Sequence, residues 1–390
     1  MKLVEAYATN TGSKIDKPFI FQKFFPLPFD KYITIHASSG MASKNYDYYK
    51  EALLLILDNL TQNKYTIIQL GDAKDEQLPM AIDFRGKTDI HQTAYVLARS
   101  SLHLSNDTFS AHVAGHFKVP LVTLFSVSKP GVSAPFWNDP YKSVFIETDR
   151  KGKKPTCAAD ESPKTINNIK PEDIAEHISN LLGLNYKKNI ETLYIGSQYK
   201  NMVIETVPNQ VINPNFIKGV LNIRADYFFN EENIYRQIAT NKCCIVVDRP
   251  LKIDILRQLR QNIALLIYDL DNDDSLDFVK GIRNTAIPFG LVTAKENDEL
   301  DKLKLKYFNF AIVNPVKKIK KEEVDNYSKI SDNTYFKTNR LILSDQKVFP
   351  SKAHWKANEP CESLQNTIAK IKDDQDFWRD IDNHFIFNKI

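Results

Sequence analysis

The chain has 390 residues, of which 43% are hydrophobic, so it is long enough for two domains that each bury an ordinary core. The 52 Lys and Arg residues against 48 Asp and Glu residues give a net charge of +4, which is too weak to imply nucleic acid binding by itself. The four cysteines lack metal-ligand spacing, no apolar run reaches membrane-spanning length and the N-terminus has no apolar signal sequence, so we expect a reduced, cytoplasmic protein.

The first half alternates strand-like and helix-like runs after an irregular, linker-like segment at 1–30. Strands that alternate with helices predict a parallel, doubly wound sheet, and we assign it to a lobe at 31–186. The expected strands are 31–40, 64–72, 102–107, 119–126 and 143–149, and the expected helices are 46–62, 91–100, 110–117 and 170–184.

The alternation begins again after residue 186 and predicts a second Rossmann-like lobe at 187–315, followed by a C-terminal extension at 316–390 with a terminal helix within 361–385. No internal repeat is evident. The fold class we expect is therefore α/β, with two doubly wound lobes facing a cleft. The expected strands are 191–197, 201–207, 220–226, 243–248, 264–271, 289–294 and 309–314, and the expected helices are 230–241, 250–262, 274–284 and 296–307.

Small polar residues follow the first strand, where Ser38, Ser39 and Gly40 form a loop and Lys44 comes soon after. Small residues let backbone N–H groups approach a phosphate, hydroxyls add donors, and a lysine adds positive charge. The loop is therefore a candidate diphosphate site, although an ordinary strand-to-helix turn would have the same sequence.

Acidic residues follow the second strand. Gly71 ends that strand, and Asp75 and Glu76 come just after it, where a carboxylate can accept hydrogen bonds from ribose hydroxyls. The three residues are candidates for ribose or base binding. A solvated loop is the structural alternative.

The third site is the sequence Ser-Asn-Asp-Thr at the end of the strand 102–107, where a helix begins. The free N–H groups of a first helical turn attract an anion. Helix capping by Asp107 or Thr108 is the structural alternative. The candidate diphosphate-binding residues at this corner are Asn106, Asp107, Thr108, Phe109, Ser110 and His112.

All three sites stand at the carboxyl ends of parallel strands, the edge at which open α/β sheets bind ligands. A nucleoside diphosphate fits the set, with its ribose near Asp75 and Glu76 and its phosphates between the other two loops.

The segment from Asp83 to Gly131 also resembles the nucleotide-sugar-binding lobe of family 9 glycosyltransferases, the heptosyltransferase-like enzymes. The resemblance covers about residues 30–185. The matching residues are Asp83, Gly86, Thr88, Asp89, Ile90, Ala94, Leu97, Ala98, Ser105 to Thr108, His112, Pro120, Phe125 and Pro130.

The resemblance implies the GT-B architecture, with a nucleotide sugar bound in one lobe and the acceptor in the other, no cofactor and usually no metal. The sequence departs from the family at Phe109, where the family has Gly, and at Ser126, where it again has Gly. The donor-like lobe also comes first here, whereas the family places it second. The order indicates a circular permutation or a divergent second lobe.

The implied activity is transfer of a hexose, heptose or pentose from a nucleotide-diphosphate sugar to an acceptor hydroxyl. The acceptor is a surface glycan, as in lipopolysaccharide, or a hydroxymethylated base in phage-type modified DNA, and peripheral membrane contact stays open. Lysines at 317–321 could contact an anionic acceptor, with a solvated segment as the alternative.

The transfer needs a base to take the acceptor proton. Asp248 at a strand end of the second lobe is the candidate, with Asp269 and Asp271 as alternatives and Asp107 as a second candidate catalytic residue. Two other functions remain open: a sugar-nucleotide epimerase or hydrolase of the same architecture, and a non-catalytic sugar-nucleotide-binding protein.

Overall fold

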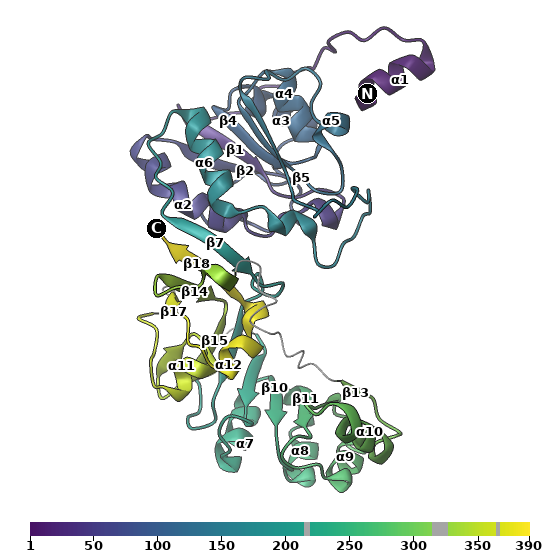
Figure 1. Cartoon of the computed structure of the whole chain (residues 1–390), viewed down its shortest axis with the longest axis vertical. Helices are drawn as coiled ribbons and strands as arrows, with labels where there is room; N and C mark the ends of the chain where they lie inside the picture. Colours follow the sequence, from purple (N-terminus) through teal and green to yellow (C-terminus); the bar gives the residue numbers. More distant parts are fainter. Residues whose placement is uncertain (214–218, 314–326, 364–366) are drawn as a thin grey trace. The chain divides into compact units, whose positions relative to one another are not determined.

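The computed structural model describes residues 1–213, 219–313, 327–363 and 367–390. The chain forms two compact units (Figure 1): unit 1 is Met1–Thr192 together with Ile390, and unit 2 is Leu193–Lys389. Each unit is built on a largely parallel sheet with connecting helices, so the expected α/β fold class is confirmed. The lysines at 317–321 lie outside the described residues.

Unit 1 contains a six-stranded parallel sheet with the order β3-β2-β1-β4-β5-β6. The strand order changes direction between β1 and β4, which is the point where open α/β sheets bind ligands. The strands are β1 (Tyr32–His36), β2 (Thr66–Leu70), β3 (Ile82–Asp83), β4 (Leu102–Asn106), β5 (Leu121–Phe125) and β6 (Ser143–Glu147).

Helices cover both faces of this sheet, because right-handed crossovers on the two sides of the switch point leave the sheet on opposite faces. Helices α2 and α6 pack on each other, and α3 packs on α4 (Figure 1). The helices of unit 1 are α1 (Leu3–Thr11), α2 (Tyr49–Gln62), α3 (Ile90–Ala98), α4 (Phe109–His116), α5 (Pro130–Ser133) and α6 (Pro171–Leu182), with 3₁₀ turns η1 (Ala42–Lys44) and η2 (Thr165–Asn168).

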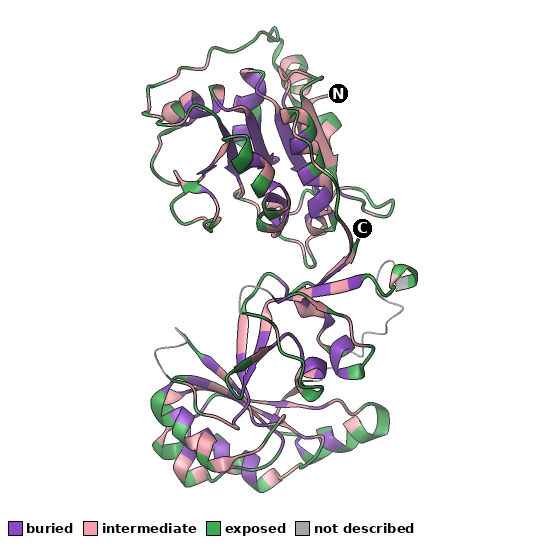
Figure 2. Ribbon diagram, turned by 90° about the vertical axis from the view of Figure 1, so that its left-hand side faces the viewer, coloured by how far each residue is buried: buried purple, intermediate pink, exposed green. Residues whose placement is uncertain are grey.

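Local sequence explains these elements. Helix α2 buries Leu53, Ile56 and Leu60, which recur at helical spacing on one face. Helix α6 begins at Pro171, which needs no N–H at that position, and ends at Leu182 with Gly183 as its C-cap, whose φ of 67° is the left-handed conformation that favours glycine. In Figure 2 the sheet strands of unit 1 are largely buried.

The segment 1–30 is irregular apart from α1, none of whose residues is buried. The segment 19–29 includes Phe25, Leu27 and Phe29, which pack against the unit 1 core. This part of the chain is thus partly anchored to the domain that follows it.

Unit 2 has an eight-stranded sheet with the order β13-β12-β11-β10-β9-β8-β15-β16 and a four-stranded sheet with the order β17-β14-β18-β7. The first sheet comprises β8 (Val203–Thr206), β9 (Leu221–Arg224), β10 (Cys243–Val247), β11 (Ile263–Asp269), β12 (Phe289–Val292), β13 (Ile312–Val313), β15 (Arg340–Ser344) and β16 (Lys347–Phe349). The second comprises β7 (Ile190–Ile195), β14 (Thr334–Thr338), β17 (Ala369–Lys370) and β18 (His384–Lys389).

Four helices connect the parallel strands of unit 2 in succession, and two short helices lie in its C-terminal part. They are α7 (Glu231–Thr240), α8 (Ile253–Gln258), α9 (Leu276–Arg283), α10 (Asn297–Lys306), α11 (Lys352–Lys356) and α12 (Gln375–Arg379), with 3₁₀ turns η3 (Arg260–Asn262), η5 (Tyr327–Lys329) and η6 (Ile381–Asn383).

The C-terminal part differs from the prediction in two ways. Its described residues 327–363 and 367–389 are built into unit 2, where β15 pairs with β8 and β18 pairs with β14, so they are not a separate extension. The predicted terminal helix is wrong for the described part of 361–385, where the helical segments are the five-residue α12 and the short 3₁₀ turn η6. Asp374 caps α12, and the consecutive apolar residues Phe385, Ile386 and Phe387 form part of the strand β18 and are all buried.

Among the described residues, none of the helices combines the length and apolar character that a membrane crossing would require.

Candidate functional site

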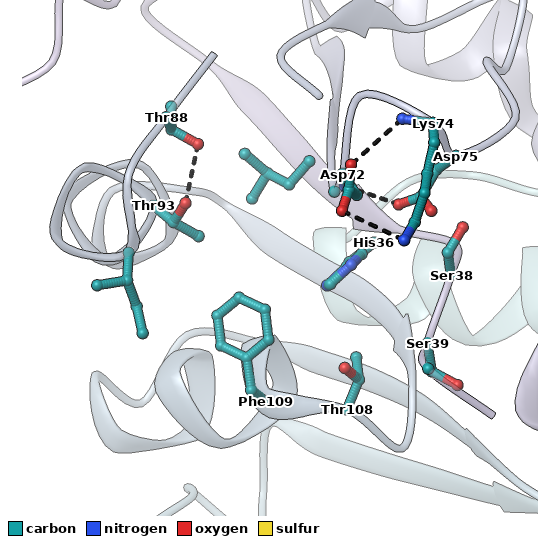
Figure 3. A pocket seen from close by; sticks show the side chains of 14 residues that line it. His36, Ser38, Ser39, Asp72, Lys74, Asp75, Thr88, Thr93, Thr108 and Phe109 are labelled. Atoms are coloured by element: carbon teal, nitrogen blue, oxygen red, sulfur yellow. Dashed lines mark hydrogen bonds and ion pairs between the residues drawn. The ribbon is translucent and has the colours of Figure 1, made fainter. Parts of the chain in front are cut away.

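A pocket of about 470 Å³ lies at the carboxyl edge of β1, β2 and β4 in unit 1 (Figure 3). It stands at the switch point of the sheet and receives residues from each of the three strand ends singled out in the sequence. The lining residues are His36, Ser38, Ser39, Gly40, Leu70, Gly71, Asp72, Lys74, Asp75, Thr88, Ile90, Thr93, Thr108 and Phe109.

The loop after β1 brings Ser38, Ser39 and Gly40 to the pocket, as predicted. Asn106 holds this loop, because its Nδ2 donates to Ala37 O at 2.7 Å while its Oδ1 accepts from the Tyr49 hydroxyl at 2.6 Å. Asn106 is fully buried and lies outside the lining, so it orients the loop from beneath.

The loop after β2 brings Gly71 and Asp75 to the pocket. Gly71 has φ 144°, and a Cβ there would lie 2.5 Å from Asp75 Oδ2, so only glycine fits. Asp75 Oδ2 accepts from Asp72 N at 2.8 Å, and Arg85 Nη1 donates to the Asp75 carbonyl. Glu76, the neighbouring candidate, lies outside the lining, and its carbonyl accepts from Gln69.

The start of α4 supplies Thr108 and Phe109. Thr108 is the N-cap residue, but its side chain makes no capping hydrogen bond, so its hydroxyl is available to a ligand. Phe109 is 45% exposed in the pocket wall and meets the His36 ring edge-on at 5.5 Å. The residue that replaces the family's Gly therefore faces the pocket.

The start of α3, which also borders the pocket, has a side-chain cap, unlike the start of α4. The Asp89 carboxylate accepts from His91 N at 3.0 Å and from Gln92 N at 2.8 Å. The N-terminus of α3 is thus occupied by a side chain of the protein itself, whereas that of α4 is not.

Lys44 and Asp107 form an ion pair beside the pocket and do not line it. Lys44 Nζ lies 2.7 Å from Asp107 Oδ2, with the side chains 18% and 6% exposed. The same oxygen accepts from Ser128 at 2.6 Å and from Ser133 at 3.2 Å. These contacts join η1, α4 and the segment after β5.

The last two residues predicted at this corner point elsewhere. Ser110 is fully buried beneath the pocket, where its hydroxyl bonds to two histidines. His112 is exposed on α4 and does not line the pocket.

Asp248 belongs to unit 2, at the end of β10. It accepts from Arg249 Nε at 3.0 Å and from Asn272 Nδ2 at 2.9 Å. Burial favours a higher pKa for Asp248, but these hydrogen bonds and the Arg249 charge outweigh it and hold the pKa below its usual value.

The alternative bases lie at the end of the neighbouring strand. Burial raises the pKa of Asp269, with nearby aspartates adding to the effect. The Asp271 carboxylate accepts hydrogen bonds from the Thr293 hydroxyl and from Ala294 N. Of the carboxylates at the ends of β10 and β11, Asp269 therefore has a higher pKa than Asp248.

Sequence reasoning missed half of the lining. Lys74 and Asp72 lie between predicted residues in the loop after β2, so the rule that ligands gather at strand ends could have found them. His36 is the last residue of β1 and opens the loop proposed to bind phosphate, but it was not itself chosen as a ligand contact. The other residues missed are Leu70, Thr88, Ile90 and Thr93.

No group of three or more His, Cys, Asp or Glu side chains in the described part of the chain is arranged to hold a metal ion.

The match to known families falls on unit 1. Residues 13–161 match the family profile "Glycosyltransferase family 9 (heptosyltransferase)", which covers the pocket and all three loops. No curated protein matches the chain.

Solved structures with similarity include E. coli ADP-heptose lps heptosyltransferase II, at 21% identity over 46% of this chain and 51% of that one, with a TM-score of 0.31. A glycosyl transferase family 9 protein from Veillonella parvula has 20% identity over 46% and 50%, with a TM-score of 0.33. The iron-containing heptosyltransferase TibC, solved with ADP-D-beta-D-heptose, has 18% identity over 40% and 46%, with a TM-score of 0.32.

The chain spans about half the length of these solved relatives. With TM-scores this low, the superpositions assign no role to individual residues. On the profile match, residues 13–161, within the N-terminal unit of this chain, are similar to glycosyltransferase family 9.

Proposed function

We propose that unit 1 binds a nucleotide-diphosphate sugar in the pocket at the switch point, and that the protein transfers the sugar to an acceptor hydroxyl. The observation that carries the proposal is the convergence of the three strand-end loops on one pocket. Its volume of about 470 Å³ lies within the range of small-molecule sites.

The pocket has a side suited to anions. The hydroxyls of Ser38 and Thr108 and the unblocked N-terminus of α4 supply hydrogen-bond donors to a diphosphate. Lys74, 82% exposed and 3.7 Å from Asp72, adds a mobile positive charge at the rim. The leaving diphosphate of a glycosyl transfer needs stabilisation of this kind.

The family supports a glycan as the acceptor, since its members include heptosyltransferases. Unit 2 is the candidate acceptor-binding part, with Asp248 as the proposed base. Because hydrogen bonds hold its pKa low, Asp248 would be ionised at neutral pH but would be a weak proton acceptor.

The first experiment is a thermal-shift panel of nucleotide sugars with different bases, led by nucleotide heptoses. A ligand at 100 times its Kd stabilises the folded protein by about 2.7 kcal/mol. Thr108→Val should weaken binding of the donor that shifts the protein, whereas Thr61→Val, on the exposed side of α2, should not. If no nucleotide sugar raises the melting temperature, the proposed function is wrong.

A turnover assay then separates the enzyme classes. A transferase consumes the donor rapidly only when a glycan acceptor is present. Rapid consumption without acceptor would indicate a hydrolase or an epimerase instead, and binding without any turnover would indicate a non-catalytic protein.

A further inference from the structure

A chain of buried hydrogen bonds runs from the pocket into the sheet of unit 1. His36 Nδ1 lies 3.0 Å from Ser110 Oγ, and Ser110 Oγ lies 2.9 Å from His103 Nε2. His103 Nδ1 lies 2.9 Å from Thr34 Oγ1, which donates to the carbonyl oxygen of Leu102 at 3.3 Å. His36 is 7% exposed, and the other side chains are fully buried.

Both histidines are neutral at physiological pH. Burial, with a smaller contribution from the neighbouring His36, lowers the pKa of His103 to about 3. Burial also lowers the pKa of His36, although the Asp75 carboxylate opposes the shift. A neutral imidazole has one N–H donor and one bare nitrogen acceptor, so each ring has a definite tautomer.

The last hydrogen bond in this series, from Thr34 to Leu102, determines which atom donates in each of the others. A carbonyl oxygen only accepts, so the Thr34 hydroxyl uses its proton on Leu102 and its lone pair accepts from His103 Nδ1–H. His103 Nε2 is then bare and accepts the proton of Ser110. The Ser110 oxygen in turn accepts from Nδ1–H of His36.

This direction leaves Nε2 of His36 without a proton. His36 lines the pocket, and the hydrogen bond to protein described for its ring is the one from Nδ1 to Ser110. Beside it stands the Asp75 carboxylate: the Cβ position of Gly71 lies 3.5 Å from His36 Cδ2 and 2.5 Å from Asp75 Oδ2. Figure 3 shows His36 and Asp75 on the same side of the pocket.

We infer that His36 is locked as a hydrogen-bond acceptor and that, with Asp75, it binds a pair of hydroxyl groups on the nucleotide sugar. This inference rests on the proposed function and deepens it. Two neighbouring acceptors suit a vicinal diol and repel a phosphate, so the diphosphate is directed to the hydroxyl donors of Ser38 and Thr108. The diol belongs either to the ribose or to the transferred sugar.

The tautomer can be measured without any ligand. In ¹⁵N–¹H NMR of the labelled protein, we expect the proton of His36 on Nδ1 and a bare Nε2, with the signals assigned by their loss in His36→Phe. Ser110→Ala removes the hydrogen-bond partner of His36 Nδ1 and should let His36 exchange between its two tautomers. Ser179→Ala, a buried serine on α6, is the matched control and should leave the His36 signals unchanged. A proton on Nε2 in the wild-type protein would overturn the inference.

The diol is tested with the nucleotide sugar that binds, its 2′-deoxyribose analogue and an analogue that lacks hydroxyls on the transferred sugar. One neutral hydrogen bond corresponds to roughly a 3- to 10-fold change in Kd. We expect the wild-type protein to bind one of the two analogues with a Kd higher by that factor than the Kd of the parent nucleotide sugar. The His36→Phe variant should bind that analogue and the parent with equal Kd.

The analogue that shows this effect identifies which diol is bound. If His36→Phe still discriminates against the analogue as the wild type does, or if the wild type discriminates against neither, the diol assignment is wrong. If no nucleotide sugar binds at all, the proposed function fails and the diol assignment with it, whereas the NMR result on the tautomer stands separately.

Discussion

Asp107→Asn tests whether the carboxylate beside the pocket is structural or catalytic. Asp107 is 7% exposed and accepts from Lys44, Ser128 and Ser133. Breaking a buried ion pair costs about 3–5 kcal/mol. The Lys44 side chain is 18% exposed and can turn to water, and Asn keeps one acceptor for Ser128, so we expect a loss of about 2–3 kcal/mol.

The loss should appear as a fall of about 5–10 °C in the melting temperature of unit 1, since 1 kcal/mol corresponds to about 2–4 °C for a domain of this size. Calorimetry is the assay, because the two units can unfold separately. Asp301→Asn, which breaks the exposed pair with Lys304, is the control and should cost less than 0.5 kcal/mol. Unchanged stability in Asp107→Asn together with lost transfer would refute the structural role and favour a catalytic one.

Three further substitutions test the site and the fold. Gly71→Ala should displace the Asp75 carboxylate and weaken nucleotide-sugar binding at least 10-fold by calorimetric titration; unchanged affinity would contradict the tight fit at Gly71. Phe109→Gly should leave the fold intact but weaken donor binding roughly 10-fold through lost apolar contact; if affinity rises instead, the ring obstructs the donor. His384 is buried with neither ring nitrogen hydrogen-bonded in the described structure, and burial lowers its pKa to about 3. Below its unfolded pKa of about 6.5 the unfolded chain therefore binds a proton that the folded chain does not, and stability falls as the pH drops towards 3. In urea denaturation, His384→Phe should retain roughly 2 kcal/mol more stability than the wild type on going from pH 7 to pH 5; equal losses would show that His384 is not the cause.

Strand ends were the most predictable part of the molecule. Alternating apolar strands and amphipathic helices located the sheet of unit 1, and the rule that ligands gather at carboxyl ends located Ser38, Asp75 and Thr108 on one pocket. Periodicity is a local property, and so is the position of a residue at the end of a strand.

Side-chain direction was not predictable in the same way. Lys44 was chosen as a ligand contact for its charge and Asp107 for its place in the Ser-Asn-Asp-Thr corner, but the two side chains pair with each other at 2.7 Å. Lys44 and Asp107 are 63 residues apart in the sequence, so no local pattern could predict that their side chains come into contact. The strand β18 was missed for a related reason: its short apolar run could belong to a helix or a strand, and its pairing with β14 is a long-range contact.

The cap on α3 has a consequence for the way a ligand enters the pocket. Two helices begin there, and a polyanion could in principle approach either; the Asp89 carboxylate closes one of them. Asp89 is itself paired with Lys23 at 2.9 Å, so it occupies the start of α3 and leaves the start of α4 as the uncapped helix N-terminus in the pocket wall. Removing the Asp89 carboxylate would free the N–H groups of His91 and Gln92 and give an anion a second helix N-terminus near the pocket.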